Sequence, residues 1–290
     1  MHTFEYANLK AFTMNSNFSN SQTQFSIINS LKVAFRHFGQ GEPILFYNRF
    51  RGILDTWDPL FLDTLAEKYT IVLFDYPGIG ESEGELSTDI AEVAAVGVKL
   101  MGNLGINKFH AAGWSYGGLV AQTALFMNRE KVAKAVLIGT NPPGINEVPF
   151  DKTFFERALK PINDLEDETV AFFEPSSEKS RAASKASFDR IAVKLDRTKI
   201  PSTPEQFQKY FEGSAMIKKD IHDYRGQYKT LKNPVLVISA DHDISFAVEN
   251  WFPLLRHAPS MQHIIINDAG HGLQHQEPVL IAGYISLFLS

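Results

Sequence analysis

Short apolar runs of strand length recur along the chain and are bounded by turn residues. The runs at 43–48 (PILFYN) and 70–76 (TIVLFDY) are continuous, which is typical of strands buried in a parallel sheet. The earlier segment 31–39 (LKVAFRHFG) alternates apolar and polar residues, so it predicts a half-exposed strand. Further strand-like runs lie at 108–113, 132–140, 234–239 and 261–268.

The segments between these runs have the spacing of helices. At 58–69 (DPLFLDTLAEKY) apolar residues recur at the intervals of one helix face, and 90–106, 119–128 and 277–290 also favour helix. Alternation of strands and helices predicts an α/β fold with a mostly parallel, twisted sheet that carries helices on both faces.

The alternation stops after the NPPG segment at 141–144. Residues 146–231 are more polar and contain helix-like stretches at 154–160, 165–173, 180–195 and 200–213, with no strand-like run between them. We therefore expect a core domain formed by 25–145 and 232–290, interrupted by a helical insertion at 146–231. Residues 1–24, rich in Asn and Ser, predict a flexible leader in which Met14 is an alternative start.

Composition narrows the class of protein. The 290 residues carry a net charge of −5, which offers no footprint for nucleic acid or for anionic membranes. No cysteine is present, so disulfides, thiolate metal sites and cysteine nucleophiles are excluded. The first residues lack the pattern of a secretory signal, and no apolar run reaches the ~18 residues that a membrane span needs. We expect a cytoplasmic protein.

The segment GWSYG at 113–117 fits the G-x-S-x-G pattern of a nucleophile on a sharp strand-to-helix turn. An apolar run precedes it and a helical segment follows it, as that turn requires. Small residues are needed at Gly113 and Gly117 because side chains there would collide with the neighbouring backbone. The following helix N-terminus offers free amides to a developing oxyanion. We predict that Ser115 is a nucleophile rather than part of a structural turn.

A serine nucleophile needs a base, and the base needs an orienting acid. His271 lies in a glycine-flanked loop after the run at 261–266, at a strand end that suits a base. His275, four residues later, is expected at the surface or rim. Two aspartates compete for the acid after the run at 234–239. Asp243 lies far enough past the strand end to turn towards the histidine loop, whereas Asp241 is placed to cap the turn.

The chain resembles the α/β-hydrolase superfamily in segments that occur in the family's order, including 43–59, 72–85, 113–118, 235–243 and 268–272. The segments NRFRG and DTWDP further resemble a subgroup of bacterial and fungal hydrolases. The resemblance implies the α/β-hydrolase fold, with 146–231 as a helical cap over the pocket. It also implies the catalytic triad Ser115, Asp243 and His271. The backbone amides of Phe50 and Tyr116 would form the oxyanion hole, with no metal or organic cofactor.

The chain departs from the family where many relatives have His-Gly after the first buried strand. Here Asn48 and Arg49 occupy these positions, so backbone freedom is lost and a large cation lies near the site. Either side chain contacts substrate or braces the loop; in the alternative, Arg49 points to solvent. Trp114 either packs beside the nucleophile or contacts substrate. Aromatic residues of the insertion either line an apolar pocket or form the buried faces of its helices.

These features predict a serine hydrolase that cleaves a small-molecule carboxylic ester or lactone through an acyl-enzyme. Carbon–carbon bond hydrolysis and cofactor-free perhydrolysis use the same triad and remain alternatives. A ligand-binding protein of this fold with little turnover is an alternative of another class, supported only by the Asn48-Arg49 replacement.

Overall fold

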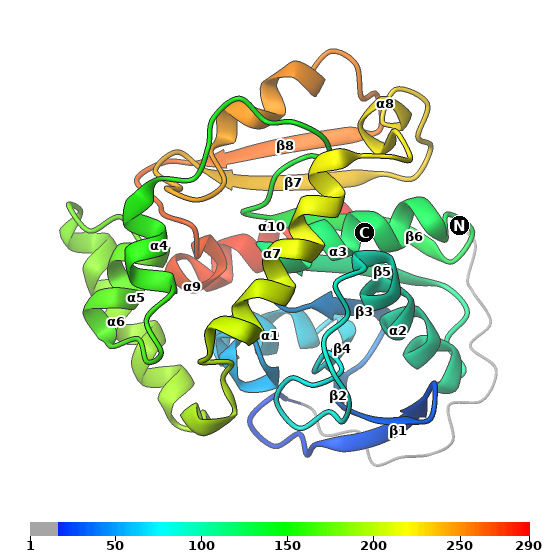
Figure 1. Cartoon of the computed structure of the whole chain (residues 1–290), viewed down its shortest axis with the longest axis horizontal. Helices are drawn as coiled ribbons and strands as arrows, with labels where there is room; N and C mark the ends of the chain where they lie inside the picture. The colour runs from blue at the N-terminus through cyan, green and yellow to red at the C-terminus, as the bar shows by residue number, and fades with distance from the viewer. Residues whose placement is uncertain (1–16) are drawn as a thin grey trace.

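The structure, a computed structural model, describes residues 17–290 (Figure 1). Its centre is an eight-stranded sheet with the order β1-β2-β4-β3-β5-β6-β7-β8. The pairs β1/β2 and β2/β4 are antiparallel, and the other pairs are parallel. The strands are β1 (Gln24–Ile28), β2 (Leu31–Gly39), β3 (Glu42–Tyr47), β4 (Tyr69–Phe74), β5 (Phe109–Trp114), β6 (Val132–Ile138), β7 (Val235–Ala240) and β8 (Met261–Ile266).

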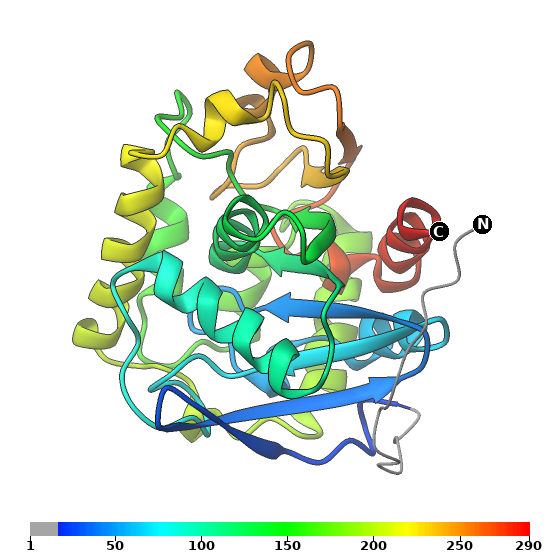
Figure 2. The same ribbon diagram turned by 90° about the vertical axis from the view of Figure 1, so that its right-hand side faces the viewer.

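Helices cover both faces of the sheet, as predicted. The buried residues of α2 (Ile90–Asn103) and α3 (Tyr116–Met127) pack with one face. Those of α1 (Pro59–Ala66) and α10 (Pro278–Leu289) pack with the other. Figure 2 shows α10 (red) on the opposite side of the molecule from the yellow segment that contains α7. No helix within residues 17–290 is long and apolar enough to cross a membrane. The predicted α/β class is confirmed.

The prediction of a half-exposed strand at 31–39 is wrong, because all residues of β2 from Val33 onward are buried. The alternation failed as a guide for two reasons. The strand β1, which the sequence reading did not identify, pairs with β2 and takes the exposed edge of the sheet. On one face of β2, the ring of Phe18 packs 5.8 Å from that of Phe38.

The predicted leader is likewise wrong for its last residues. Phe18 is buried, its amide donates to Asp63 Oδ1 at 2.6 Å, and its carbonyl accepts from the Ser21 hydroxyl at 2.7 Å. Phe18 and Ser21 are therefore buried against the core, whereas residues 19, 20 and 22 are exposed. Residues 1–16, with the alternative start at Met14, lie outside the described residues.

Between β6 and β7 the chain forms helices and, within the described residues, no strand. We call residues 146–231 the cap. In Figure 1, α4, α5 and α6 lie together and α7 runs diagonally across the view. Most of these helices begin at a side-chain N-cap, Asp151, Asp164, Ser177 or Thr203, which supplies an acceptor for the first free amides. The helices are α4 (Lys152–Ala158), α5 (Leu165–Phe172), α6 (Glu178–Ala192), η2 (Arg197–Lys199), α7 (Pro204–Lys219) and α8 (Tyr224–Gln227).

Three short helices complete the core. The 3-10 helix η1 follows β3, and the 3-10 helix η3 lies between β7 and β8. A single turn of α-helix, α9, follows the histidine loop after β8. Their bounds are η1 (Leu54–Thr56), η3 (Val248–Leu254) and α9 (Leu273–Gln276).

Candidate active site

The candidate residues follow four parallel strands and therefore meet at one edge of the sheet. Asn48, Arg49 and Phe50 follow β3, and Ser115 follows β5. Asp243 follows β7 and His271 follows β8. In open parallel sheets the carboxyl ends of the strands form the usual ligand crevice, since the loops that leave them converge there.

Ser115 occupies a strained turn between β5 and α3. Its φ of 62° and ψ of −124° are unfavourable for an L-residue. A Cβ on Gly113 would lie 2.0 Å from the Gly117 carbonyl oxygen, and one on Gly117 would lie 2.0 Å from the Tyr47 carbonyl oxygen. Backbone atoms cannot yield at such distances, so both positions require glycine. The two glycines allow the sharp turn, and the turn holds Ser115 at the start of α3.

Asp243 and His271 form a buried pair. The Asp243 Oδ2 atom lies 2.8 Å from His271 Nδ1, and Oδ1 accepts hydrogen bonds from the Ser245 amide and hydroxyl and from the Phe246 amide at 2.7–2.8 Å. Burial alone would raise the pKa of the Asp243 carboxyl. The charge of His271 and these hydrogen bonds outweigh burial and hold that pKa below its ordinary value. An ionised Asp243 accepts from Nδ1–H and leaves Nε2 as the basic nitrogen of the ring.

The competing Asp241 faces away from this pair. Its Oδ1 atom lies 2.7 Å from Nδ1 of His242, whose side chain is half exposed, and accepts from the Ala269 amide at 3.3 Å. Asp241 thus bonds the loop that leads to His271 without touching the imidazole of His271.

The imidazole of His271 is enclosed by aromatic rings. Its ring centre lies 5.5 Å from that of Phe246 and 6.0 Å from those of Phe154 and Phe172. Its Nε2 is buried and has no hydrogen-bond partner within residues 17–290. Trp114, the residue before Ser115, holds the loop that carries His271, because its indole donates to the His271 carbonyl at 3.0 Å. No hydrogen bond joins Ser115 to His271 in the described part of the chain.

The cap packs directly on the histidine loop. The Gly272 amide donates to the Phe172 carbonyl at 2.6 Å. A Cβ on Gly270 would lie 2.4 Å from the carbonyl carbon of Phe173. The glycine before His271 is therefore required by the close approach of cap backbone.

The two expected oxyanion donors lie in different local structures, Tyr116 at the start of a helix and Phe50 in a turn. Tyr116 is the first residue of α3, so its amide has no acceptor within the helix. Phe50 lies in a turn that the Gly52 amide closes on the Arg49 carbonyl at 2.9 Å. The Phe50 ring packs against cap aromatics, with ring centres 5.2–5.6 Å apart; these are Phe207, Tyr210 and Phe211. Phe207 and Tyr210 thus lie on the buried face of a cap helix, as one of the two alternatives predicted.

The Asn48 side chain braces the core. It is fully buried, donates to the Phe74 carbonyl and accepts from the Trp57 indole, both at 2.8 Å. Of the two roles expected for this residue, bracing the loop fits the structure and substrate contact does not. The Tyr76 hydroxyl also donates to the Asn48 carbonyl at 2.8 Å.

Arg49 does not point freely to solvent. Its guanidinium carbon lies 4.8 Å from the Phe172 ring centre and 5.3 Å from that of Trp114. Its Nη1 donates to the Phe50 carbonyl at 2.7 Å. Burial lowers the pKa of Arg49, against the opposing effect of the Glu168 carboxyl. Trp114 therefore packs between Arg49 and the histidine loop.

Sequence reasoning missed Arg51, which joins the core to the cap. Its side chain is buried and donates to five acceptors of the cap at 2.6–2.9 Å: the carbonyls of Ala158, Lys160, Pro161 and Pro201, and Asn163 Oδ1. Arg51 also has a φ of 60°. The signal was the recurrence of arginine in NRFRG, but the acceptors are mainly backbone carbonyls, which no sequence motif marks.

A second core-to-cap contact uses Asp58 of the DTWDP segment. Its carboxylate accepts from Arg190 Nη2 at 2.6 Å and from the Ser187 hydroxyl at 2.7 Å. His275 lies beside it, with Nδ1 3.3 Å from the Ser187 hydroxyl and its ring 4.7 Å from that of Trp114. The expectation of a surface or rim position for His275 is wrong, since α9 turns the residue under the cap, where it is buried.

A cavity of about 350 Å³ lies between the loop after β6 and α7. Phe246, which stacks on His271, forms part of its wall, as does Leu119, one helical turn after Ser115. Neither Ser115 nor His271 lines it. The cavity is at the lower end of the size range of small-molecule pockets.

Comparisons with known proteins agree with this architecture. The profile of the family described as alpha/beta hydrolase fold matches residues 42–278. The chain is 23% identical over 240 residues to a pimeloyl-[acyl-carrier protein] methyl ester esterase of Legionella pneumophila, covering 81% of this chain and 89% of that protein. An alpha/beta hydrolase fold protein from Chitinophaga pinensis superposes with a TM-score of 0.83 at 24% identity, over 94% of this chain and 99% of that one.

A higher identity is confined to part of a longer protein. The chain is 34% identical over 152 residues to the dihydrolipoyllysine-residue acetyltransferase component of an acetoin cleaving system from Cupriavidus necator. The match covers 49% of this chain but only 40% of that protein.

Proposed function

Because this chain belongs to the alpha/beta hydrolase fold family, and is thus an enzyme of hydrolase type, we propose that it is a serine hydrolase of small-molecule carboxylic esters or lactones. One observation carries the proposal. The buried Asp243–His271 pair, 2.8 Å apart, leaves Nε2 of the imidazole without a hydrogen-bond partner within residues 17–290. The strained turn that bears Ser115 is tied to this pair, because the indole of the preceding Trp114 donates to the His271 carbonyl.

In the proposed reaction Ser115 attacks the substrate carbonyl, and Nε2 of His271 takes the hydroxyl proton. Asp243 holds the imidazole in the required tautomer through Nδ1–H and stabilises the imidazolium that forms. The amides of Phe50 and Tyr116 bind the oxyanion, and their location on backbone makes this independent of the Asn48-Arg49 replacement. His271 then protonates the leaving alcohol, and water releases the acyl group from Ser115 by the reverse roles.

The surroundings of the imidazole favour this chemistry. Phe154, Phe172 and Phe246 exclude water from His271, and electrostatic interactions are stronger in such a site than in water. The neighbouring cavity of about 350 Å³ offers room for a small acyl or alcohol group.

Labelling with a fluorophosphonate tests the proposal. The folded protein should be labelled at Ser115, the Ser115→Ala variant should not be labelled, and the His271→Ala variant should react far more slowly. Asp243→Asn and Asp241→Asn form a matched pair of acid variants. We expect ester turnover to fall by about 10³–10⁴-fold in Asp243→Asn and by less than threefold in Asp241→Asn. Folded protein that resists labelling and turns over no ester favours the ligand-binding alternative and refutes the proposal.

A further inference from the structure

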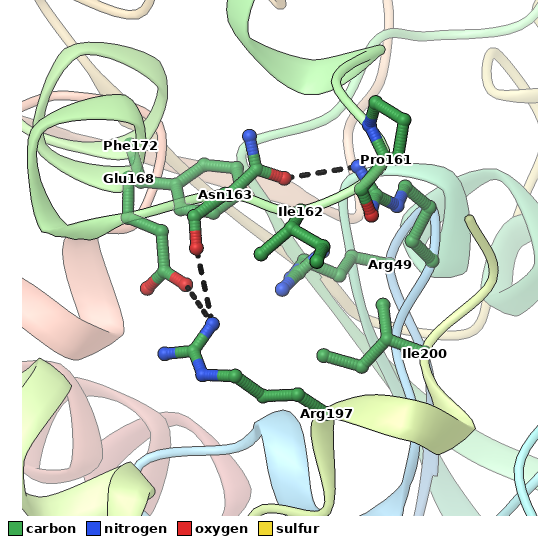
Figure 3. A pocket seen from close by; sticks show the side chains of 9 residues that line it. Arg49, Pro161, Ile162, Asn163, Glu168, Phe172, Arg197 and Ile200 are labelled. Atoms are coloured by element: carbon green, nitrogen blue, oxygen red, sulfur yellow. Dashed lines mark hydrogen bonds and ion pairs between the residues drawn. The ribbon is translucent and has the colours of Figure 1, made fainter.

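A small cavity lined by three arginines lies beside the histidine site. It has a volume of about 30 Å³, and Arg49, Arg51, Arg197 and Glu168 contribute to its wall. Figure 3 shows Arg49, Arg197 and Glu168 directed towards the same space from different segments. A volume of this size holds one or two water molecules or one small polar group, so it fits part of a substrate and not a whole one.

Two of the three guanidinium groups already have partners. Arg51 is bonded to the cap carbonyls described above. Arg197 donates to the Asn163 carbonyl at 3.1 Å and lies 3.8 Å from Glu168 Oε1. Glu168 is thus shared, and its half-buried carboxyl faces more positive than negative charge. Burial raises the pKa of Glu168, while Arg49, Arg197 and Arg51 oppose that rise.

Arg49 is the arginine of this cavity whose donors are least used. Among the described residues neither Arg49 nor Arg51 has a carboxylate oxygen within 4.0 Å of its guanidinium nitrogens, whereas Arg197 has Glu168 within that distance. Arg51 uses its donors on five acceptors of the cap, and Arg49 does not. Its Nε is buried and has no hydrogen-bond partner in residues 17–290. In the described part of the chain, Nη1 donates to the carbonyl of the next residue, Phe50, and no other hydrogen bond of the guanidinium is formed. A planar guanidinium with free donors is suited to binding a carboxylate through two parallel hydrogen bonds.

The Phe172 ring lies next to both the Arg49 guanidinium and the candidate base His271. The guanidinium lies 4.8 Å from the centre of the Phe172 ring, which is itself 6.0 Å from that of His271. These two steps bound the separation of guanidinium and imidazole at about 11 Å. Arg49 is also adjacent in sequence to Phe50, whose amide is a proposed oxyanion donor. This separation is within the length of a short dicarboxylic acid chain.

We propose that Arg49 binds a free carboxylate of the substrate, so that the preferred substrates are half-esters of short dicarboxylic acids or lactones that bear an acid group. This inference rests on the proposed serine hydrolase function. The acid group of the substrate occupies the arginine-lined cavity, and the ester carbonyl lies at Ser115. Glu168 competes with that acid group for the positive charge.

The test compares an acid with its neutral isostere on one enzyme. Monoethyl adipate and ethyl 5-carbamoylpentanoate differ only by a carboxylate and an amide, and ethanol release measures kcat/KM for each. In the unaltered chain we expect the acid to be preferred by roughly 10- to 100-fold, the range of one charge-assisted contact. The same pair made from succinate to suberate should show an optimum length, because the span between Arg49 and His271 is fixed.

Variants then assign the preference to a residue, and the ratio of the two kcat/KM values is the readout. Arg49→Met should lower the ratio to near 1, and Arg49→Lys should retain part of it. Glu168→Gln should raise the ratio, because it removes the carboxylate that competes with the substrate. If Arg49 and Glu168 had only a structural role, this substitution would not change the ratio. Arg256→Met, at an exposed arginine, should leave the ratio unchanged. A chain that prefers the amide, or a ratio that survives in Arg49→Met, overturns the inference.

The two proposals fail in different ways. A preference for the neutral isostere with normal fluorophosphonate labelling of Ser115 removes the role of Arg49 and leaves the serine hydrolase intact. Loss of labelling in the folded, unaltered chain removes the serine hydrolase itself. Because the preference of the unaltered chain is measured first, the test does not depend on the folding of Arg49→Met.

Discussion

Arg51 is expected to be a main determinant of how firmly the cap is held on the core. Three acceptors surround its Nη1 at 2.7–2.9 Å and share two hydrogens, while Nε and Nη2 each donate to one proline carbonyl. Burial, followed by the charge of Arg49, lowers the pKa of Arg51 to about 10, so the group is still cationic at neutral pH. The interaction is therefore charge-assisted on every bond.

The expected cost of removing the guanidinium comes from the acceptors that water cannot reach. Ala158 and Pro201 are buried, whereas Lys160, Pro161 and Asn163 are partly or fully exposed and can be hydrated. An unpaired buried carbonyl costs about 1–3 kcal/mol, so the loss of two partners in Arg51→Met should lower the free energy of unfolding by about 2–6 kcal/mol. The left-handed backbone conformation of residue 51 is a second contribution to stability, because it strains any residue with a Cβ. Glycine relieves this strain, so Arg51→Gly should be more stable than Arg51→Met by roughly 1 kcal/mol.

Urea denaturation measures these differences, and hydrogen exchange locates them. Exchange should accelerate in Arg51→Met at residues 158–163 and around 201, where the acceptors lie. Arg181→Met is the matched control, since Arg181 also belongs to a helix of the cap but donates to one exposed carbonyl, that of Pro175. That control should stay within about 0.5 kcal/mol of the unaltered chain. If Arg51→Gly is as stable as the unaltered chain, the contacts of the side chain do no more than offset the backbone strain that glycine relieves, and the reasoning is refuted.

Three further predictions test the turn, its strain and a buried histidine. Gly113→Ala should lower the melting temperature by several degrees or prevent folding, because its Cβ meets backbone at 2.0 Å; Gly283→Ala, a helical glycine with no atom within 4 Å of the new Cβ, should raise stability by about 0.5–1 kcal/mol. Ser115→Gly should be more stable than Ser115→Ala by about 1 kcal/mol in thermal unfolding, because φ is 62° there, and both should lack esterase activity. Burial lowers the pKa of His275 to about 3, so below pH 6.5 the unfolded state binds a proton that the folded state does not bind. Stability should therefore fall by about 2 kcal/mol between pH 7 and pH 5, and His275→Gln should remove this part of the slope; an unchanged slope contradicts a neutral, buried His275.

The features that sequence reasoning predicted are those with a local signal. Continuous apolar runs marked the buried parallel strands, and the glycines around Ser115 marked a sharp turn because steric exclusion acts over a few residues. The errors at β2 and His275 have the opposite origin. The burial of β2 depends on β1 and Phe18, and that of His275 depends on cap residues such as Ser187. When distant segments bury a strand or helix, the sequence of that element contains no hydrophobic periodicity that would reveal its burial.

The loop after β3 shows why the departure from His-Gly did not reveal its own purpose. Sequence reasoning noted the lost glycine and the new cation, and looked for the consequence at Asn48 and Arg49. The left-handed conformation occurs instead at Arg51, where an L-residue is strained, and the cap contacts of its side chain offset that strain. Since four of its five acceptors are backbone carbonyls, almost any residue type can stand at their positions. When the arginine of one segment binds the backbone of another, only the arginine can be recognised in the sequence, and the segment that accepts its hydrogen bonds carries no motif.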